Sequence, residues 1–464
     1  MHSSSFFGFL AFASAGLAAL EVDLDSPDSI RNAAKQVAYD LMSYYHGNES
    51  GQTPGILPGP PPDGDYYWWI GGALWGVMLD YWHYTGDDTY NAQVNQSLLH
   101  QTGPNRDFLE PNWTASTGND DQSFWAMSAL LAAEVKFPDP PKGQPQWLAL
   151  AQAVWNEQAN EDRRNSSLCG MGLRWQMYPQ NKGYDYKNGK LNPTLEHYNV
   201  YDGIHWSFGP APEYRLGCSS TNRAQFSYSA AALIQGAANL YNYTNGDTRW
   251  KDRLEGLVTQ TLAYFAPDGF LVEPSWEFSD TCDTDMISFK GHVHRWLASA
   301  SQLATFTAPL ILPVLRTSTQ AAVDHCTAGD NGRMCTFSWA PSAQKGPTGA
   351  CQQMNVLGAL SSSLVVEAKA PVTNTTGGTS IGDANAGSAR LPLHPYLHTI
   401  DTGDRVGAAF VTVGLALGTL AIFLRMSWEE DSFDKRFSYG LRESYQLEDM
   451  ASRKGKFMKR RRKG

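Results

Sequence analysis

The chain has 464 residues, of which 42% are hydrophobic, 12% aromatic and only 18% charged. A chain of this length can bury one large core or two smaller ones. Its formal net charge is −10. The 12 Lys and Arg and 7 Asp and Glu from Arg425 onward give +5, which leaves −15 for residues 1–424. An acidic body of this kind argues against nucleic acid as a partner.

The N-terminus has the pattern of a secretory signal peptide, which we expect over residues 1–19. The apolar run Phe6–Phe12 is followed by small residues, although no Lys or Arg precedes it. Asn-x-Ser/Thr sequons support export and predict N-glycosylation. They begin at Asn48, Asn95, Asn112, Asn165, Asn242 and Asn374.

Residues 25–367 are predicted to form one all-α domain. Turn signals separate ten segments with helical apolar periodicity. These segments are about 28–45, 68–84, 88–101, 121–136, 146–158, 224–242, 248–265, 286–305, 309–324 and 350–367. No Cys-x-x-Cys or His-x-x-x-His spacing suggests a metal site, and we expect neither metal nor cofactor.

The most informative stretch is Ser116–Ala126, which places two adjacent carboxylates at the N-terminus of a predicted helix. Two carboxyl groups as close as Asp120 and Asp121 repel each other when both are ionised, so their pKa values should split. Glycosidases use one protonated carboxyl as the general acid and one ionised carboxyl as the nucleophile or base. The alternative is an acidic N-cap beside the helix dipole. Aromatic rings in Tyr66–Gly76 suit a sugar-binding cleft, because the apolar face of a pyranose stacks on them.

Three blocks in this order carry a resemblance to a known family. They are Gly-Asn-Asp-Asp at 118–121, Gly-Leu-Arg-Trp-Gln at 172–176 and Tyr-Lys-Asn at 186–188. From about Ile30 to about Leu364 the chain resembles the family 76 glycoside hydrolases, specifically the fungal cell-wall mannan endo-1,6-alpha-mannosidases. The resemblance implies an (α/α)6 toroid of twelve helices with a cleft at one end. It also implies that Asp120 is the nucleophile and Asp121 the acid/base.

The adjacency of the two carboxylates also bears on stereochemistry. It favours the ~5–5.5 Å separation of retaining glycosidases over the ~6.5–9.5 Å of inverting ones. Other residues are candidates for substrate binding, with core packing or helix capping as the alternatives. Those expected to stack on sugars are Trp68, Trp69 and Trp175. Those expected to hydrogen-bond hydroxyls are Asn188, Asp202, Gln225 and Asp285. We expect Lys290 and Arg295 to meet buried carboxylates rather than a phosphate.

The toroid is expected to lack about one helical hairpin. After its Tyr-Lys-Asn block the family continues with two helices, whereas only Gly189–Val200 separates Asn188 from Tyr201 here. Twelve residues are too few, since each helix needs roughly 10 or more. A missing exon or a divergent splice form explains the gap, and apolar helix faces should be exposed beside it.

Six cysteines in an oxidising compartment should mostly pair. Cys326 and Cys335 span a Gly-Asp-Asn-Gly turn and are expected to form a disulfide. The resemblance implies a second pair, Cys218 with Cys282. The missing hairpin should leave Cys169 without its partner, and we expect Cys351 to be free or to pair ectopically.

The C-terminal part changes composition three times. Residues 368–404 are rich in Thr, Gly and Ser and predict a glycosylated stalk. Residues 406–424 form an uncharged apolar run long enough for one transmembrane helix. Residues 425–464 then predict a basic cytosolic tail, as in a type I protein of the plasma membrane with its helical domain facing the cell wall. A lipid-anchor signal would instead end in its hydrophobic tail.

The leading hypothesis is a retaining endo-α-1,6-mannosidase or transglycosidase. By resemblance, its substrate is cell-wall α-1,6-mannan or the mannose core of glycosylphosphatidylinositol (GPI)-anchored glycoproteins, which it would cross-link to wall glucan. The alternative is a catalytically inactive glycan-binding or scaffold protein of the cell surface. We expect a monomer with no nucleic-acid partner.

Overall fold

The computed structural model describes most of the region between Ala19 and Ser388 and a C-terminal helix. The described residues are 19–61, 63–113, 117–165, 172–173, 175, 190–191, 194–207, 217–279, 281–341, 346–388, 402–403, 405–422 and 424–425. The expected signal peptide (apart from residue 19), Asn188, Cys169 and the tail beyond Arg425 lie outside them. The chain divides into two units, Met1–Leu393 and His394–Gly464.

The core of the first unit is a set of five inner helices. They are α2 (Trp68–Thr85), α4 (Asn119–Glu134), α6 (Ser227–Tyr243), α8 (Phe289–Leu303) and α10 (Ala350–Ser362). Most residues of α2 and every residue of α10 are buried, including the polar Gln353 and Asn355 of α10. A helix that is buried around its whole circumference is covered on all sides by other elements, so these two helices lie inside the fold.

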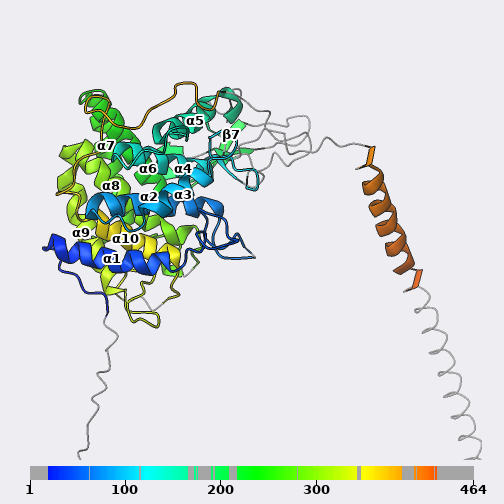
Figure 1. Cartoon of the computed structure of the whole chain (residues 1–464), viewed down its shortest axis with the longest axis horizontal. Coiled ribbons are helices and arrows are strands. Elements are labelled where there is room, and N and C mark those ends of the chain that lie inside the picture. The colour runs from blue at the N-terminus through cyan, green and yellow to red at the C-terminus, as the bar shows by residue number, and fades with distance from the viewer. Residues whose placement is uncertain are drawn as a thin grey trace, which may run out of the picture. The chain divides into compact units, whose positions relative to one another are not determined.

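Five outer helices cover the inner ones. They are α1 (Pro27–Met42), α3 (Asn91–His100), α5 (Trp147–Ala159), α7 (Thr248–Phe265) and α9 (Ala308–Asp324). Most bury one face only, as α1 does through Ile30, Val37 and Leu41. The Ser26 hydroxyl accepts a hydrogen bond from the Ser29 amide and so caps α1. Inner and outer helices alternate along the chain, which is the order of an (α/α) toroid (Figure 1).

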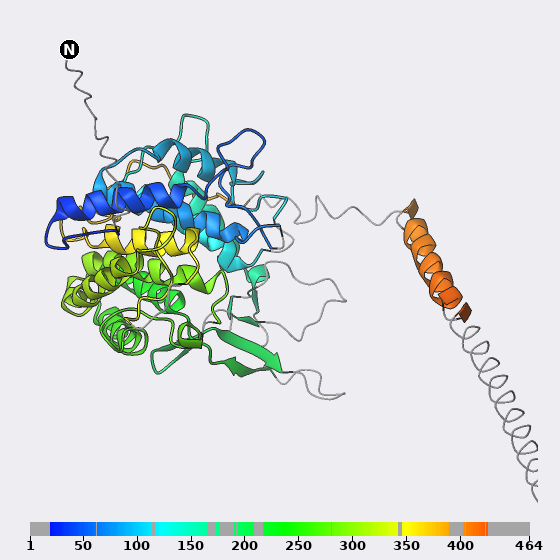
Figure 2. The same cartoon turned by 90° about the horizontal axis from the view of Figure 1, so that it is seen from below.

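The inner helices form an incomplete ring. Helix α4 packs on α2, α2 on α10, α10 on α8, and α8 on α6. Figure 2 shows the outer helix α1 lying beside α10. The ten predicted segments coincide with α1–α10, so the all-α class is confirmed. Between α5 and α6, where the sequence predicted a missing hairpin, the described residues form short strands.

These strands occupy part of Arg164–Asn222. They are β1 (Arg164–Asn165), β2 (Gly172–Leu173), β3 (Lys190–Leu191), β4 (Thr194–Glu196), β5 (Asn199–Tyr201), β6 (Gly203–Ser207) and β7 (Gly217–Asn222). All pairings are antiparallel: β1 with β2, β4 with β5, and β6 with both β3 and β7. The described residues between α5 and α6 thus form small two- and three-stranded sheets.

One predicted disulfide is present and the other is not. Cys326 and Cys335 are joined, as their short turn predicts. Cys282 carries a free thiol, so the expected Cys218–Cys282 pair is not formed. The resemblance implied this pairing for a chain with two helices after its Tyr-Lys-Asn block, whereas here Cys218 belongs to β7 and lies opposite Trp206 of β6. Cys351 is buried and free.

The chain beyond α10 differs from the stalk expected over 368–404. Up to Ser388 it lies along α4 and α5 within the first unit. The Val372 amide donates to the Glu134 carbonyl at 2.8 Å, and the Leu148 amide donates to Ser380 Oγ at 3.0 Å. Gly387 has a φ of +70°, and a Cβ there would lie 2.6 Å from the Ala153 carbonyl oxygen. Small residues therefore allow the backbone to approach the helices closely, a role that composition alone does not reveal.

The second unit contains one helix among the described residues. Arg405–Ile422 spans 18 residues with a mean hydropathy of 1.7, which is long and apolar enough to cross a membrane.

Candidate active site

The N-terminal ends of four inner helices meet around one cavity of about 180 Å³. First-turn or immediately preceding residues of α2, α4, α6 and α8 line it, together with loop residues. The lining residues are Trp69, Asp120, Asp121, Phe124, Trp175, Asp202, Phe226, Tyr228, Asp283, Asp285, Met286 and Phe289. Helix N-termini carry partial positive charge, so this end of the toroid favours carboxylates and negative charge that develops during a reaction.

The backbone at the start of α4 holds the carboxylate pair in place. Gly118 is the N-cap residue in an extended conformation, and its amide donates to Asp121 Oδ2 at 2.5 Å. A Cβ on Gly118 would lie 2.4 Å from Asp120 Oδ1 and 2.9 Å from Trp175 Nε1. Glycine is therefore required at position 118 for both carboxylates to keep their positions.

Asp121 has the surroundings of a general acid. Burial raises its pKa well above the ordinary value, and repulsion from Asp120 and Asp285 raises it further, while the Gly118 amide opposes the shift. A carboxyl with a raised pKa stays protonated in mildly acidic solution and can donate that proton. The pKa of Asp285 is also raised, to about 6, by burial and by the charges of Asp283 and Asp120.

Asp120 has different surroundings from its neighbour. Trp175 Nε1 donates a hydrogen bond to Asp120 Oδ2 at 3.2 Å. The two adjacent carboxyls therefore differ in their hydrogen-bond partners. The predicted splitting of their pKa values stays a prediction.

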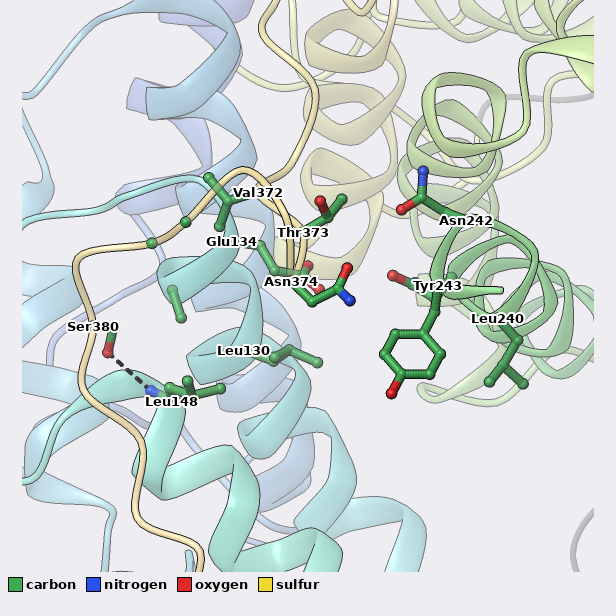
Figure 3. Close-up of a pocket in the computed structure, with 14 residues that line it drawn as sticks. Leu130, Glu134, Leu148, Leu240, Asn242, Tyr243, Val372, Thr373, Asn374 and Ser380 are labelled. Carbon is green, nitrogen blue, oxygen red and sulfur yellow. Dashed lines mark hydrogen bonds between the residues drawn. The ribbon is translucent and has the colours of Figure 1, made fainter. Parts of the chain in front are cut away.

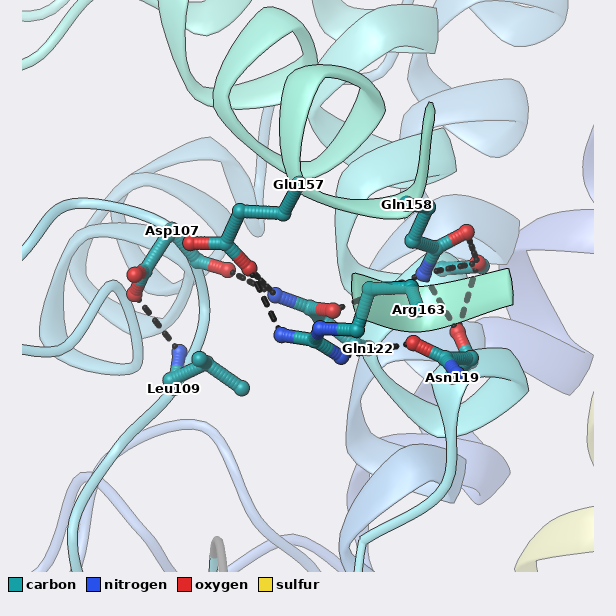
Figure 4. A network of polar contacts seen from close by, with 8 residues as sticks. Asp107, Leu109, Asn119, Gln122, Glu157, Gln158 and Arg163 are labelled. Carbon is teal, nitrogen blue, oxygen red and sulfur yellow. Dashed lines mark hydrogen bonds and ion pairs between the residues drawn. The ribbon is translucent and has the colours of Figure 1, made fainter. Parts of the chain in front are cut away.

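A polar network behind the pair fixes the first turn of α4 (Figure 4). Arg163 Nη1 donates to Asn119 Oδ1 at 2.6 Å, and Arg163 Nη2 donates to Glu157 Oε2 at 3.0 Å. Gln122 Nε2 donates to the same Glu157 oxygen at 2.9 Å. Burial and the neighbouring Asp107 carboxyl raise the pKa of Glu157 to about 8. The network ties α4 to α5, so the catalytic turn rests on a rigid support.

Four of the predicted substrate-binding residues lie in the cavity wall. They are Trp69, Trp175, Asp202 and Asp285. Trp69 is 6% exposed, and its Nε1 donates to Asp285 Oδ1 at 3.0 Å. Asp285 makes no capping hydrogen bond to its own short helix. Asp202 Oδ2 accepts from Asn222 Nδ2 at 2.7 Å, between β5 and β6.

Two of the other predicted binding residues, Trp68 and Gln225, are not among the described residues that line this cavity. Trp68 packs in the core, where it stacks on Trp125 and donates to Gln101 Oε1 at 2.8 Å. The core-packing alternative is therefore correct for Trp68. Gln225 is buried at the start of α6 outside the lining. Asn188 lies outside the described residues.

Sequence reasoning missed the aromatic wall opposite Trp69. Phe226, Tyr228 and Phe289 line the cavity. The Tyr228 and Phe289 ring centroids lie 4.3 Å apart, and Phe226 stacks on Trp276 at 4.7 Å. The positions of these three residues could have identified them. Each ring comes just before or within the first turn of an inner helix, as Asp120 and Asp121 do.

The two basic residues of α8 meet buried carboxylates, as expected. Lys290 Nζ donates to Glu277 Oε1 at 2.9 Å, and both side chains are fully buried. Arg295 pairs with Asp80 of α2. The Lys290–Glu277 pair joins α8 to a segment 13 residues earlier, and the Arg295–Asp80 pair joins α8 to α2, 215 residues away.

An alternation of inner and outer helices, with adjacent carboxyls in an aromatic cavity at the helix N-termini, defines a glycosidase of the helical-toroid class. The model of the Glycosyl hydrolase family 76 matches residues 29–195 and 191–375. The chain therefore belongs to glycoside hydrolase family 76.

Two relatives and two solved structures illustrate the likeness. The mannan endo-1,6-alpha-mannosidase DCW1 of Saccharomyces cerevisiae is 35% identical over 444 residues, or 89% of this chain and 97% of the relative. DFG5 of the same yeast, which has the same enzyme name, is 33% identical over 445 residues, 88% of this chain and 93% of the relative.

Among solved structures, Dfg5 from Chaetomium thermophilum, crystallised in complex with glucosamine, is 45% identical with a TM-score of 0.71. The match covers 79% of this chain and 97% of that one. An α-1,6-mannanase of Salegentibacter sp. HEL1_6 is 14% identical with a TM-score of 0.52, over 73% of this chain and 99% of that one. That second likeness shows the shared fold.

Proposed function

We propose that this protein is a retaining endo-α-1,6-mannosidase or transglycosidase of the fungal cell wall. The observation that carries the proposal is the Asp120–Asp121 pair, whose members are adjacent but differ in their partners and lie in an aromatic cavity. The relatives named mannan endo-1,6-alpha-mannosidase support α-1,6-linked mannose as the substrate.

The first chemical step forms a glycosyl-enzyme. An Asp120 oxygen attacks the anomeric carbon of the mannose as the bond from that carbon to the leaving oxygen breaks. Asp121 donates its proton to the leaving oxygen, so the leaving sugar departs as a neutral alcohol. The Trp175 indole N–H donates to Asp120 Oδ2 and orients this carboxyl before the attack.

The second step reverses the roles. Asp121, now ionised, removes a proton from the incoming hydroxyl, whose oxygen attacks the anomeric carbon and displaces Asp120. Two inversions at one carbon return the α configuration. Water as acceptor gives hydrolysis, and a sugar hydroxyl gives transfer, as in attachment of a GPI-core mannose to wall glucan.

Substrate recognition follows from the cavity wall. The Trp69, Tyr228 and Phe289 rings suit the apolar faces of mannose, and Asp202 and Asp285 suit its hydroxyls. We assign residues 25–367 as the catalytic domain and 1–19 as the signal peptide. The chain then acts as a monomer at the plasma membrane, with one C-terminal span near 406–424, a cytosolic tail and the catalytic domain toward the wall. The apolar Arg405–Ile422 helix supports this topology.

The test is turnover of an α-1,6-mannan oligosaccharide by the purified chain, followed from its first minutes by proton NMR. An α-configured first product supports retention, and an initial β-anomer would exclude it. Product analysis with and without a β-glucan oligosaccharide distinguishes transfer from hydrolysis. Binding without turnover would instead favour the glycan-binding alternative.

A further inference from the structure

A furrow opens on the side of the toroid between α4 and α6, where the ring of inner helices is incomplete. Its inner part is a cavity of about 180 Å³ that reaches Phe124 and Trp296. Its outer part is a second cavity of about 480 Å³. Leu130, Glu134 and Asn239 line both, so the two cavities adjoin.

Apolar side chains are left uncovered along the outer part. Leu130 of α4 is 36% exposed, and Leu240 and Tyr243 at the end of α6 are 41% and 62% exposed. Figure 3 shows the Tyr243 ring and Leu240 on one side of this cavity and Leu130 on the other. An apolar surface gathered in one concave place is a site at which something binds.

The rim of this furrow carries two glycosylation sequons, one on each wall. Asn242-Tyr243-Thr244 ends α6, and Asn374-Thr375-Thr376 lies in the segment that crosses α4. In Figure 3 Asn374 lies across the cavity from Tyr243. Of the other described sequon residues, Asn48, Asn95 and Asn112 do not line it.

Asn374 is held in place by its own turn. The Val372 amide donates to the Glu134 carbonyl at 2.8 Å, and the Thr373 amide donates to Thr376 Oγ1 at 2.7 Å. The Asn374 side chain is exposed, and neighbouring residues make these bonds. The turn therefore presents the Asn374 amide at the furrow without needing that amide for its own structure.

We propose that the N-linked glycan on Asn374 folds into this furrow, where its inner N-acetylglucosamine residues cover Leu130, Leu240 and Tyr243. The apolar face of a pyranose ring stacks on a Tyr ring. Its hydroxyl and acetamide groups find hydrogen-bonding partners in Asn239, Glu134 and Asn242. The outer cavity also lies within the roughly 300–1,000 Å³ of small-ligand sites.

Covalent attachment favours this occupant over a free one. A sugar tethered at the rim has a high effective concentration in the furrow, so weak contacts suffice to hold it there. Carbohydrate then covers the side of the toroid between α4 and α6, where the two cavities adjoin. This role is separate from catalysis at the end of the toroid.

The first experiment compares glycosylated full-length chain with its Asn374→Gln and Asn48→Gln variants, all secreted from a eukaryotic host. Glycopeptide mass spectrometry measures site occupancy, thermal unfolding gives Tm, and a fluorescent hydrophobic dye reports exposed apolar surface. Asn374→Gln is expected to lower Tm by about 2–4 °C and to increase dye binding. Asn48→Gln, which removes an exposed sequon elsewhere, should change neither.

The second experiment tests the contact with Tyr243. Tyr243→Ala should lower Tm in the glycosylated chain but have little further effect in the Asn374→Gln background, because the two changes remove one interaction. The proposal is overturned if Asn374 carries no glycan, if Asn374→Gln behaves as Asn48→Gln does, or if the Tm losses add. A dimer in light scattering with no effect of Asn374→Gln would assign the furrow to a second copy. None of these measurements depends on catalytic turnover.

Discussion

Asp120 and Asp121 are neighbours in the chain, yet the fold gives them different electrostatic surroundings. Asp121 receives the Gly118 amide but is buried beside two further carboxyls, whereas Asp120 receives the Trp175 indole N–H. The proposed division into acid and nucleophile therefore depends on contacts with residues outside the helix that carries them.

Replacement of the proposed nucleophile provides the most direct test. Asp120→Asn is nearly isosteric but cannot form the glycosyl-enzyme, so kcat on an α-1,6-mannan substrate should fall by about 10⁴-fold or more. Asp88→Asn, at an exposed turn outside the cavity, is the control and should retain wild-type rates. Near-normal activity of Asp120→Asn, with an unchanged circular dichroism spectrum, would remove Asp120 from the mechanism.

Asp285 should act on the reaction through charge. The first step requires protonated Asp121, so the rate should fall as pH rises through the pKa of that group. The negative charge of Asp285 helps to raise this pKa. Asp285→Asn keeps an acceptor for Trp69 but loses the charge, so the alkaline limb of kcat/KM should move to lower pH.

The pH profile can be measured for wild type, Asp285→Asn and the Asp88→Asn control. An alkaline limb that stays in place in Asp285→Asn would mean that Asp121 does not titrate in that limb, or that Asp285 does not influence it.

The carboxylate pair could be predicted from sequence, whereas the orientation of neighbouring rings could not. Trp68 and Trp69 have the same side chain and the same local context. Adjacent residues on a helix point about 100° apart, and here Trp69 lines the cavity while Trp68 packs in the core. Which of the two lines the cavity depends on how α2 packs on α4 and α10, and this is a tertiary property.

At the level of elements, the entry into α4 is the most constrained backbone of the site. Gly118→Ala would put a Cβ within 2.4 Å of Asp120 Oδ1. A displacement of about 1 Å at a reacting group can cost roughly 10²-fold, and we expect kcat/KM to fall by about that factor.

A second glycine provides the matched control for this variant. A Cβ at Gly236, exposed within α6, would meet nothing within 4 Å. Gly236→Ala should therefore keep full activity and gain roughly 0.5–1 kcal/mol of helix stability. Equal activities in the two variants would show that the site tolerates a methyl group at position 118.

The buried ion pair between the η3 segment (Glu277–Ser279) and α8 should matter for stability. Lys290→Met leaves Glu277 buried without its counter-charge, so the free energy of unfolding should fall by about 3–5 kcal/mol. Arg316→Met breaks the exposed pair with Asp25 and should cost at most about 1 kcal/mol. Urea denaturation measures both, and similar losses would contradict the special role of burial.

Helices were predictable here and the short elements were not. Each of α1–α10 spans at least 10 residues, which is long enough for a helical period to show in the sequence. Strands of two to six residues, such as β1 and β7, are too short for a clear alternation. The segment up to Ser388 was missed for another reason: its backbone is held by hydrogen bonds to α4 and α5, and Gly and Ser composition does not specify such bonds.

At the scale of the whole molecule, a protease-protection experiment tests the proposed membrane topology. A type I arrangement predicts that protease added outside sealed microsomes removes about forty C-terminal residues from the cytosolic side. The catalytic domain should stay protected until detergent is added. An epitope tag at the C-terminus and antibodies to the helical domain follow the two ends. A protected C-terminal tag would contradict the assignment.

The docking of residues 368–388 on α4 and α5 also decides where the helical unit can be cut from the rest of the chain. Backbone amides along this segment donate to both helices, as Val372 does to the Glu134 carbonyl and Asp383 to Gln152 Oε1. A truncation after Glu367 would remove these bonds and uncover the surfaces of α4 and α5, whereas a truncation after Ser388 keeps them. The longer fragment should therefore be the more soluble and the more stable of the two.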